Sequence, residues 1–192
     1  MKKPIDSSVP LHPLLNERWS PRSFDLASSI DKNDLTAILE AGRWAPSANN
    51  AQPWRYVVAT RGDGHFEKLS KTFSGFNATW APNASAFILV CAVKTNAEGA
   101  VNQFAEYDSG LSAAYMTFEA IHRGLVVHQI AGFDRDQVKA EYHLADNLAL
   151  MAILVIGKQA PLEALTDETL KEREKSPRVR LPLGEIVLNG LY

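Results

Sequence analysis

Apolar residues at helical spacing predict two long helices in the chain. The first covers residues 32–44, where Asp31 precedes the stripe as an N-cap and Pro46 ends the helical run. The second covers residues 103–123 and ends at Gly124, a residue type that commonly follows a helix. The stripes comprise Leu35, Ile38, Leu39 and Gly42 in the first segment and Leu111, Ala114, Tyr115, Phe118 and Ile121 in the second.

Three shorter segments also favour helix. Residues 65–74 are expected to form a short helix, and the charged residues 166–175 are expected to form a solvated one. Another helix is predicted to begin near Arg135, because Asp134 and Gln137 have the spacing of a capping box.

Strand patterns lie between these helices. Residues 55–60 are rich in β-branched types and stop at the glycine-containing turn 61–64. The continuous apolar run 84–93 is typical of a central strand covered on both faces, and residues 148–157 repeat that pattern. The fold class predicted is α+β, in which helices cover a sheet.

The composition is that of a soluble globular protein. A chain of 192 residues with 46% hydrophobic and 22% charged side chains fits one domain, residues 1–192, and can bury a core. The formal charge of −2 argues against a nucleic-acid partner. Residues 1–15 lack the apolar stretch of a secretory signal, and no apolar run is long enough to cross a membrane. The expected location is the cytoplasm.

Metal and nucleophile motifs are weak. Cys91 is the only cysteine and lies in an apolar run, which predicts a small buried hydrophobe. The five histidines are scattered, so no metal site is predicted. Gly62 and Gly64 lack the third glycine of a dinucleotide fingerprint and predict a turn. Asp108 and Glu119 leave a carboxylate pair for acid/base chemistry open.

The polar segment 44–54, WAPSANNAQPW, is a candidate ligand-binding loop. Pro46 and Pro53 disfavour helix in the residues before them. Groups that both donate and accept hydrogen bonds come from Ser47, Asn49, Asn50 and Gln52. Such a loop can read the edge of a flat heterocycle, or it can cap its own backbone as an ordinary connector. The loop alone leaves both interpretations open.

Arginines near both ends of the chain favour a phosphate ligand. Arg18 and Arg22 flank Ser20, and guanidinium groups with a nearby hydroxyl grip phosphate through charge-assisted hydrogen bonds. Arg178 and Arg180 are alternate residues of a segment expected to be extended, so they are expected to point the same way. Together with the amide loop, they fit a planar heterocycle that carries one phosphate, such as flavin mononucleotide (FMN).

Five segments in this order resemble the FMN-dependent nitroreductase family over nearly the whole chain. They are ERWSPRSF at 17–24, APSANNAQPW at 45–54, Asn77 before the apolar strand, GLVVHQIAGFD at 124–134 and SPRVRLPLGEIV at 176–187. The resemblance implies a nitroreductase-like fold, with a central mixed or antiparallel sheet flanked by helices, in an intertwined homodimer. The apolar tail at about 181–192 would then pack on the partner subunit.

The resemblance also implies a role for each matching residue. Arg18, Ser20 and Arg180 would hold the phosphate and ribityl end of FMN, with Arg178 assisting electrostatically. Arg22 would approach the N1/O2 side of the ring, where positive charge stabilises anionic reduced flavin. The other contacts implied are Ser47, Asn49, Asn50 and Gln52 from the loop of the neighbouring subunit, Asn77 at the ring edge, and Ile130, Ala131 and Gly132 at the N5 face.

The activity implied is that of an oxidoreductase in which tightly but non-covalently bound FMN carries the chemistry. NAD(P)H would pass hydride to flavin N5, and a nitroaromatic, quinone or flavin acceptor would follow in ping-pong order. No catalytic side chain is implied. Some family members have an acidic residue at the position of Ala131, so polarity on the substrate side differs here. Alternatives are reductive dehalogenation or dehydrogenation on the same scaffold, and a non-catalytic flavin-binding protein.

Overall fold

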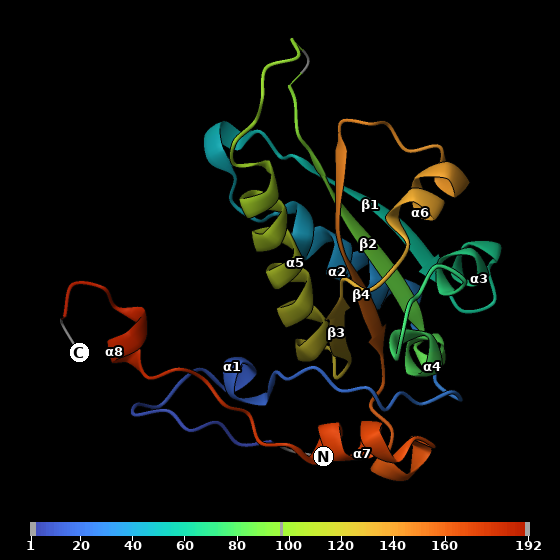
Figure 1. The fold of residues 1–192 in the computed structure, drawn as a ribbon, viewed down its shortest axis with the longest axis vertical. Coiled ribbons are helices and arrows are strands. Elements are labelled where there is room, and N and C mark those ends of the chain that lie inside the picture. Colours follow the sequence, from blue (N-terminus) through green and yellow to red (C-terminus); the bar gives the residue numbers. More distant parts are fainter. Residues whose placement is uncertain (1–2, 97, 191–192) are drawn as a thin grey trace.

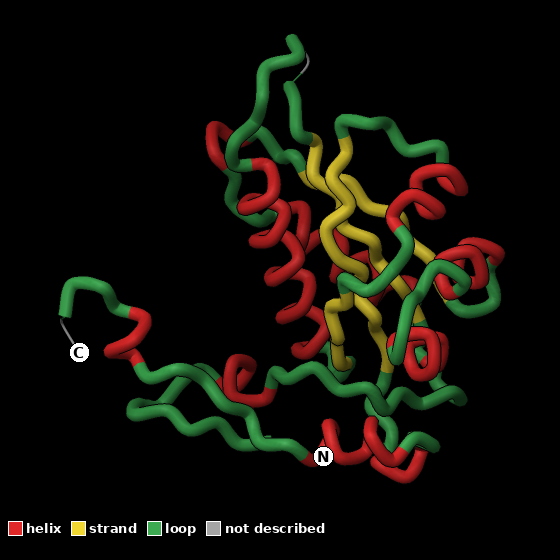
Figure 2. The backbone as a smooth tube through the Cα atoms, in the orientation of Figure 1, coloured by secondary structure: helices red, strands yellow, loops and turns green. Residues whose placement is uncertain are grey.

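A computed structural model of the chain describes residues 3–96 and 98–190. Four antiparallel strands form one sheet in the order β1-β2-β4-β3 (Figures 1 and 2). They are β1 (Trp54–Thr60), β2 (Ala86–Val93), β3 (Val126–Ile130) and β4 (Leu148–Gly157). The α+β class is confirmed, and the sheet is antiparallel throughout.

The two central strands form where the apolar runs predict them. β2 is buried along its length up to Ala92, and β4 is buried from Ile153 to Gly157. Cys91 is buried in this layer, and burial raises the pKa of its thiol to about 11, so it is protonated at neutral pH. β3 is not predicted from the sequence. It has only five residues, which pair with β4 at the edge of the sheet, and polar His128 and Gln129 interrupt its apolar pattern.

Two long helices cover one face of the sheet, α2 (Lys32–Arg43) and α5 (Ala105–His122). Asp31 caps α2 as predicted, because its side chain accepts a hydrogen bond from the Asn33 N–H. The helices approach closely at Gly42, where a Cβ atom would lie 2.7 Å from the Met116 side chain. A larger residue at position 42 would therefore force the Met116 side chain to move.

The helix predicted at 103–123 is confirmed, but its apolar stripe is not the side that packs on the sheet. The buried side of α5 consists mainly of small and polar residues: Ala105, Asp108, Ser109, Ser112, Ala113, Met116, Thr117 and Ala120. In the stripe, Tyr115 is 45% exposed and the other members are only half-buried. Close packing against α2 selects small side chains, so the larger apolar ones lie on the outer side.

The other face of the sheet is covered by α3 (Gly64–Ser70), α4 (Asn77–Trp80) and α6 (Arg135–Tyr142) (Figure 1). Aromatic side chains fill this layer, with the rings of Phe66 and Phe87 stacked at 4.1 Å. Asp134 caps α6 through the Gln137 N–H, as the capping-box spacing predicts. Short 3-10 turns lie at Ala48–Asn50, Ala81–Asn83 and Leu162–Ala164.

The two terminal segments run beside each other across one end of the sheet (Figure 1). The first carries α1 (Pro13–Glu17), and the second follows α7 (Glu168–Lys175) and ends with α8 (Leu183–Ile186). Lys3 Nζ donates to the Ser176 carbonyl at 2.8 Å, which ties the segments together. The expectation of a solvated helix at 166–175 is wrong in one respect, because Leu170 and Glu174 on α7 are buried.

The terminal segment beyond α7 leaves the body of the molecule. The part of the tail that the structure describes, 181–190, is exposed, and α8 projects away from the sheet (Figure 2). Residues 191–192 of the predicted 181–192 tail lie outside the described residues. Among the described helices, none has the length and apolar character needed to span a membrane.

Candidate functional site

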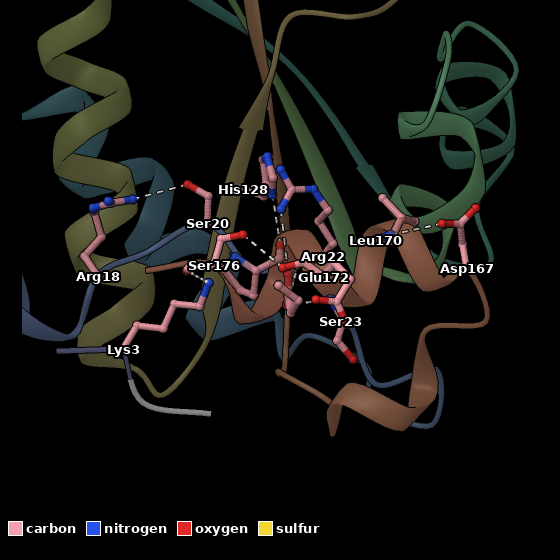
Figure 3. A network of polar contacts seen from close by, with 12 residues as sticks. Lys3, Arg18, Ser20, Arg22, Ser23, His128, Asp167, Leu170, Glu172 and Ser176 are labelled. Atoms are coloured by element: carbon pink, nitrogen blue, oxygen red, sulfur yellow. Dashed lines mark hydrogen bonds and ion pairs between the residues drawn. The ribbon is translucent and has the colours of Figure 1, made fainter. Parts of the chain in front are cut away.

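Three of the four predicted arginines converge at the crossing of the terminal segments. Arg18 Nη1 donates to Ser20 Oγ at 3.3 Å (Figure 3). Burial lowers the pKa of the Arg18 guanidinium, and the positive charges of Arg178 and Arg180 lower it further. These charges repel one another, so an anion bound among them would relieve the repulsion. We refer to Arg18, Ser20, Arg178 and Arg180 as the basic cluster.

The hydrogen bonds of the basic cluster leave donors free. Arg178 Nη1 donates to the Asn16 carbonyl at 2.6 Å and to the Lys3 carbonyl at 3.1 Å, and its Nη2 donates to the Leu15 carbonyl at 3.4 Å. Only its buried Nε has no partner among the described residues. In the part of the chain that the structure describes, Arg180 donates to the neighbouring Val179 carbonyl alone. Arg18 also lines a cavity of about 550 Å³ at the end of α5. The arrangement fits the phosphate ligand expected from the sequence.

Arg22 lies apart from this cluster and is held by α7. The buried carboxylate of Glu174 accepts the backbone N–H of Arg22 at 3.0 Å and that of Ser23 at 3.3 Å. The Arg22 guanidinium is 3.8 Å from the same carboxylate, and no acceptor in the described part of the chain lies within hydrogen-bond distance of it. Its donors therefore remain available to a ligand.

His128 on β3 holds the same segment from the sheet side (Figure 3). Its Nδ1 is 3.0 Å from the Pro21 carbonyl, and its ring lies 4.6 Å from the Trp80 ring. Burial lowers the pKa of His128 to about 4, so the ring is neutral at pH 7. A neutral ring beside a carbonyl acceptor donates through Nδ1–H.

Two backbone N–H groups directly after β3, those of Ala131 and Gly132, are free to bind a ligand. Within residues 3–96 and 98–190, neither the Ala131 N–H nor the Gly132 N–H meets an acceptor. Asn77 Nδ2 donates to the Gly132 carbonyl at 3.3 Å, and a Cβ atom on Gly132 would lie 2.7 Å from that nitrogen. The structure thus brings Asn77 to Gly132, just beyond the buried Ile130 that ends β3.

Three residues of the amide loop have left-handed backbone conformations. Asn49, Asn50 and Gln52 have φ angles of 52°, 55° and 45°, a left-handed region that costs about 1 kcal/mol for each non-glycine residue. Ser47 Oγ accepts the Gln52 N–H at 3.1 Å, and buried Asp108 accepts the Ala48 N–H at 3.0 Å. The Gln52 side chain also donates to the Asn50 carbonyl at 3.1 Å, so it caps the loop's own backbone. The amide side chains themselves are exposed.

Within one chain, the amide loop and the basic cluster lie at opposite ends of α5 (Figure 1). The loop is tied to Asp108 near the start of the helix, and Arg18 lines the cavity beside Ile121 near its end. At 1.5 Å per residue these two helix positions are about 20 Å apart. The structure therefore does not bring the loop to the basic cluster of the same chain.

Three polar residues near the site were not predicted as part of it. Glu174 and His128 contact the arginine segment from positions more than 100 residues away in sequence, and Asp108 anchors the loop. A buried glutamate in a charged helix leaves no local sequence signal. Asp108 and Glu119 do not form an acid/base pair, because Glu119 is ion-paired with Arg123 at 2.7 Å.

Comparison with known proteins gives the same family as the sequence motifs. The nitroreductase family model matches residues 15–78. An uncharacterized 15.4 kDa protein of Mycolicibacterium smegmatis is 33% identical over 146 residues, which are 72% of this chain and 97% of that protein. A putative NAD(P)H nitroreductase of Bacillus subtilis, YdgI, is 42% identical over 85 residues, which are 44% of this chain but only 40% of YdgI.

A solved structure is similar over almost the entire fold. A crystal structure described as that of an oxidoreductase containing FMN superposes with a TM-score of 0.90 at 31% identity. The superposition covers 97% of this chain and 95% of the other. With the family model and the relatives, this likeness shows that the chain belongs to the nitroreductase family.

Proposed function

We propose that the protein is an FMN-dependent oxidoreductase that takes hydride from NAD(P)H and passes it to an electron-poor acceptor. The supporting observation is a set of donors that bind no acceptor among the described residues: those of the Arg22 guanidinium and the N–H groups of Ala131 and Gly132, with the positive charges of the basic cluster nearby. His128 on β3 contacts Pro21, and Ala131 follows β3, so these groups share one edge of the sheet. The similar crystal structure is described as containing FMN, and YdgI is named an NAD(P)H nitroreductase.

The residues present suit each chemical part of FMN. Arg18, Ser20 and Arg180 hold the phosphate and the ribityl chain, and Arg178 adds positive charge. FMN, when bound, supplies the hydride acceptance and donation at N5. Neither step needs a covalent nucleophile on the protein.

A second group of residues is proposed to contact the flavin ring. Arg22 places positive charge beside the N1/O2 side, and the N–H groups of Ala131 and Gly132 donate toward N5. Asn77 orients the Gly132 peptide through its carbonyl. Ala131 leaves the substrate side without a carboxylate, which favours apolar, electron-poor acceptors such as nitroaromatics or quinones.

The proposed assembly is a homodimer with FMN at the interface. One chain cannot bring its own amide loop to its own basic cluster, because α5 separates them by about 20 Å. The outer stripe of α5 and the exposed tail supply the apolar surface that such a dimer needs. Ser47, Asn49, Asn50 and Gln52 then serve the flavin of the partner subunit.

The test combines cofactor binding with anaerobic reduction. The purified protein is expected to bind FMN and to reduce it with NADH or NADPH, as measured by bleaching of the flavin absorbance. Arg18→Ala should weaken FMN binding about 10- to 100-fold, because a charge-assisted hydrogen bond contributes about 1.5–3 kcal/mol. Lys68→Ala is the control, since Lys68 is an exposed cation on α3 that pairs with Glu141.

Three outcomes would contradict parts of this proposal. Wild-type protein that binds no FMN would overturn the cofactor. Flavin that is bound but not reduced by either nicotinamide would point to another reaction, such as dehalogenation or dehydrogenation. Bound FMN that reduces acceptors no faster than free FMN would point to a binding protein without turnover.

A further inference from the structure

We propose that Glu174 is a positioning residue that sets both the place and the effective charge of Arg22 at the flavin. The inference rests on the proposed FMN function and deepens it. Glu174 belongs to α7, a helix outside the five family-like segments, and its side chain is 1% exposed. Burying a carboxylate destabilises the folded protein unless its oxygens accept hydrogen bonds. We therefore ask what the Glu174 carboxylate binds.

Both oxygens of Glu174 are directed at the Arg22 backbone. Oε1 accepts the Arg22 N–H at 3.0 Å and the Ser23 N–H at 3.3 Å, and Oε2 lies 3.2 Å from the Arg22 nitrogen. These bonds fix the peptide from which the Arg22 side chain leaves. His128 fixes the preceding residue through the Pro21 carbonyl, so the short arginine segment is held from two sides.

The Glu174 carboxylate accepts no hydrogen bond from the Arg22 guanidinium. Nη1 of Arg22 is 3.8 Å from Oε2, too long for a hydrogen bond but close enough for a strong Coulomb interaction. The side chain of Arg22 remains 24% exposed. Arg22 therefore presents free donors to a ligand while a buried negative charge beneath it reduces its electrostatic effect.

Several charged groups surround this pair. Lys3 interacts with both Glu174 and Arg22, and Arg173 interacts with Arg22. Arg18 acts with Arg22 on His128, which is neutral at pH 7 because burial lowers its pKa to about 4. Glu174 is thus the carboxylate that balances Arg22. Removing its charge should leave Arg22 more strongly positive, which stabilises anionic reduced flavin relative to oxidised flavin.

Glu174→Gln separates this role from a purely structural one. The amide oxygen of glutamine can still accept the Arg22 and Ser23 N–H groups at the Oε1 position, but the second contact, at Oε2, and the negative charge are lost. We expect the midpoint potential of bound FMN to rise, because the preference for reduced over oxidised flavin should increase about threefold to tenfold, or about 15–30 mV for two electrons. Glu172→Gln is the matched control, since Glu172 lies on the same helix, is exposed and pairs with Lys175.

A double variant tests whether Glu174 acts through Arg22. Arg22→Gln should lower the potential, and adding Glu174→Gln to it should then produce a much smaller rise than in the wild-type background. Affinity for oxidised FMN, measured by quenching of flavin fluorescence, should change little in Glu174→Gln. Glu174→Asp is the second variant should the first fail to fold, and it should raise the potential by less, because it retracts the charge by one methylene.

The outcomes distinguish this inference from the function on which it rests. An unchanged potential in Glu174→Gln, or in Glu174→Asp if that variant replaces it, with FMN still bound and reducible, would overturn the role of Glu174 alone. An undiminished shift in the Arg22→Gln background would show that the charge acts directly and not through Arg22. Wild-type protein that binds no FMN would overturn the proposed function and this inference with it.

Discussion

At the residue scale, His128 ties the stability of the fold to pH. Burial holds its pKa at about 4, against about 6.5 in the unfolded chain. The neutral ring stabilises the folded state fully above pH 6.5, and this contribution is lost as pH falls through 4, because the unfolded chain binds a proton first. Between pH 7 and pH 5 the loss from this one group should be about 2 kcal/mol.

Urea unfolding at pH 7, 6 and 5 checks this prediction. His128→Gln should lower the free energy of unfolding at pH 7 but flatten its fall toward pH 5. His122→Gln, at an exposed histidine on the last turn of α5, should keep the wild-type fall. A slope unchanged by His128→Gln would show that another group carries the pH dependence.

Residue by residue, the motifs indicated residues that lie near one another but not the residues that support them. Arg18 contacts Ser20 and lies near Arg180, and Asn77 contacts Gly132, while their role as a site stays a prediction. Arginine, serine and asparagine side chains can be recognised as hydrogen-bond donors from the local sequence alone. The role of Glu174 cannot be recognised in this way, because its partner Arg22 is 152 residues away and only the folded chain brings the two together.

At the scale of elements, the amide loop depends on α5 for its shape. Three left-handed residues strain it, and the Asp108 carboxylate offsets part of that strain through the Ala48 N–H. Asp108→Ala should cost about 1.5–3 kcal/mol of unfolding free energy, the range for a hydrogen bond to a charged group. It should also weaken FMN binding, because the exposed amides lose their fixed positions.

Glu106→Ala is the matched control, because Glu106 is also acidic and in the first turn of α5 but is exposed. Asp108→Asn keeps an acceptor oxygen and should fall between wild type and Asp108→Ala. Urea unfolding and FMN fluorescence titration measure both effects. If Asp108→Ala retains wild-type stability and FMN affinity, the loop holds its shape without α5.

Helices and strands with a clear apolar pattern or capping residues could be predicted from the sequence. Features that depend on packing between elements could not. β2 and β4 are long apolar runs, and α2 and α6 carry capping residues at their starts. β3 is too short to show a period and forms because β4 offers it an edge. The sequence also could not show which side of α5 faces the sheet, since α2 selects small residues there.

At the scale of the whole molecule, the apolar surface left on one chain argues for a second copy. The outer stripe of α5 is only half-buried, and the tail exposes Leu181, Leu183, Ile186 and Leu188. A stable monomer rarely leaves so many large apolar side chains in water. A partner that covers them would also deliver its amide loop to the basic cluster, so assembly and cofactor binding should be coupled.

Leu188→Asp tests that coupling, because Leu188 is 96% exposed in the single chain. Burying a leucine contributes about 2 kcal/mol, and twofold symmetry counts it twice, so the dimer dissociation constant should rise about 1000-fold. Sedimentation across protein concentrations should show this loss, with FMN occupancy falling in parallel. Leu26→Asp is the control, since Leu26 is 62% exposed but lies outside the tail. A Leu188→Asp protein that stays dimeric and fully loaded would remove the tail from the interface.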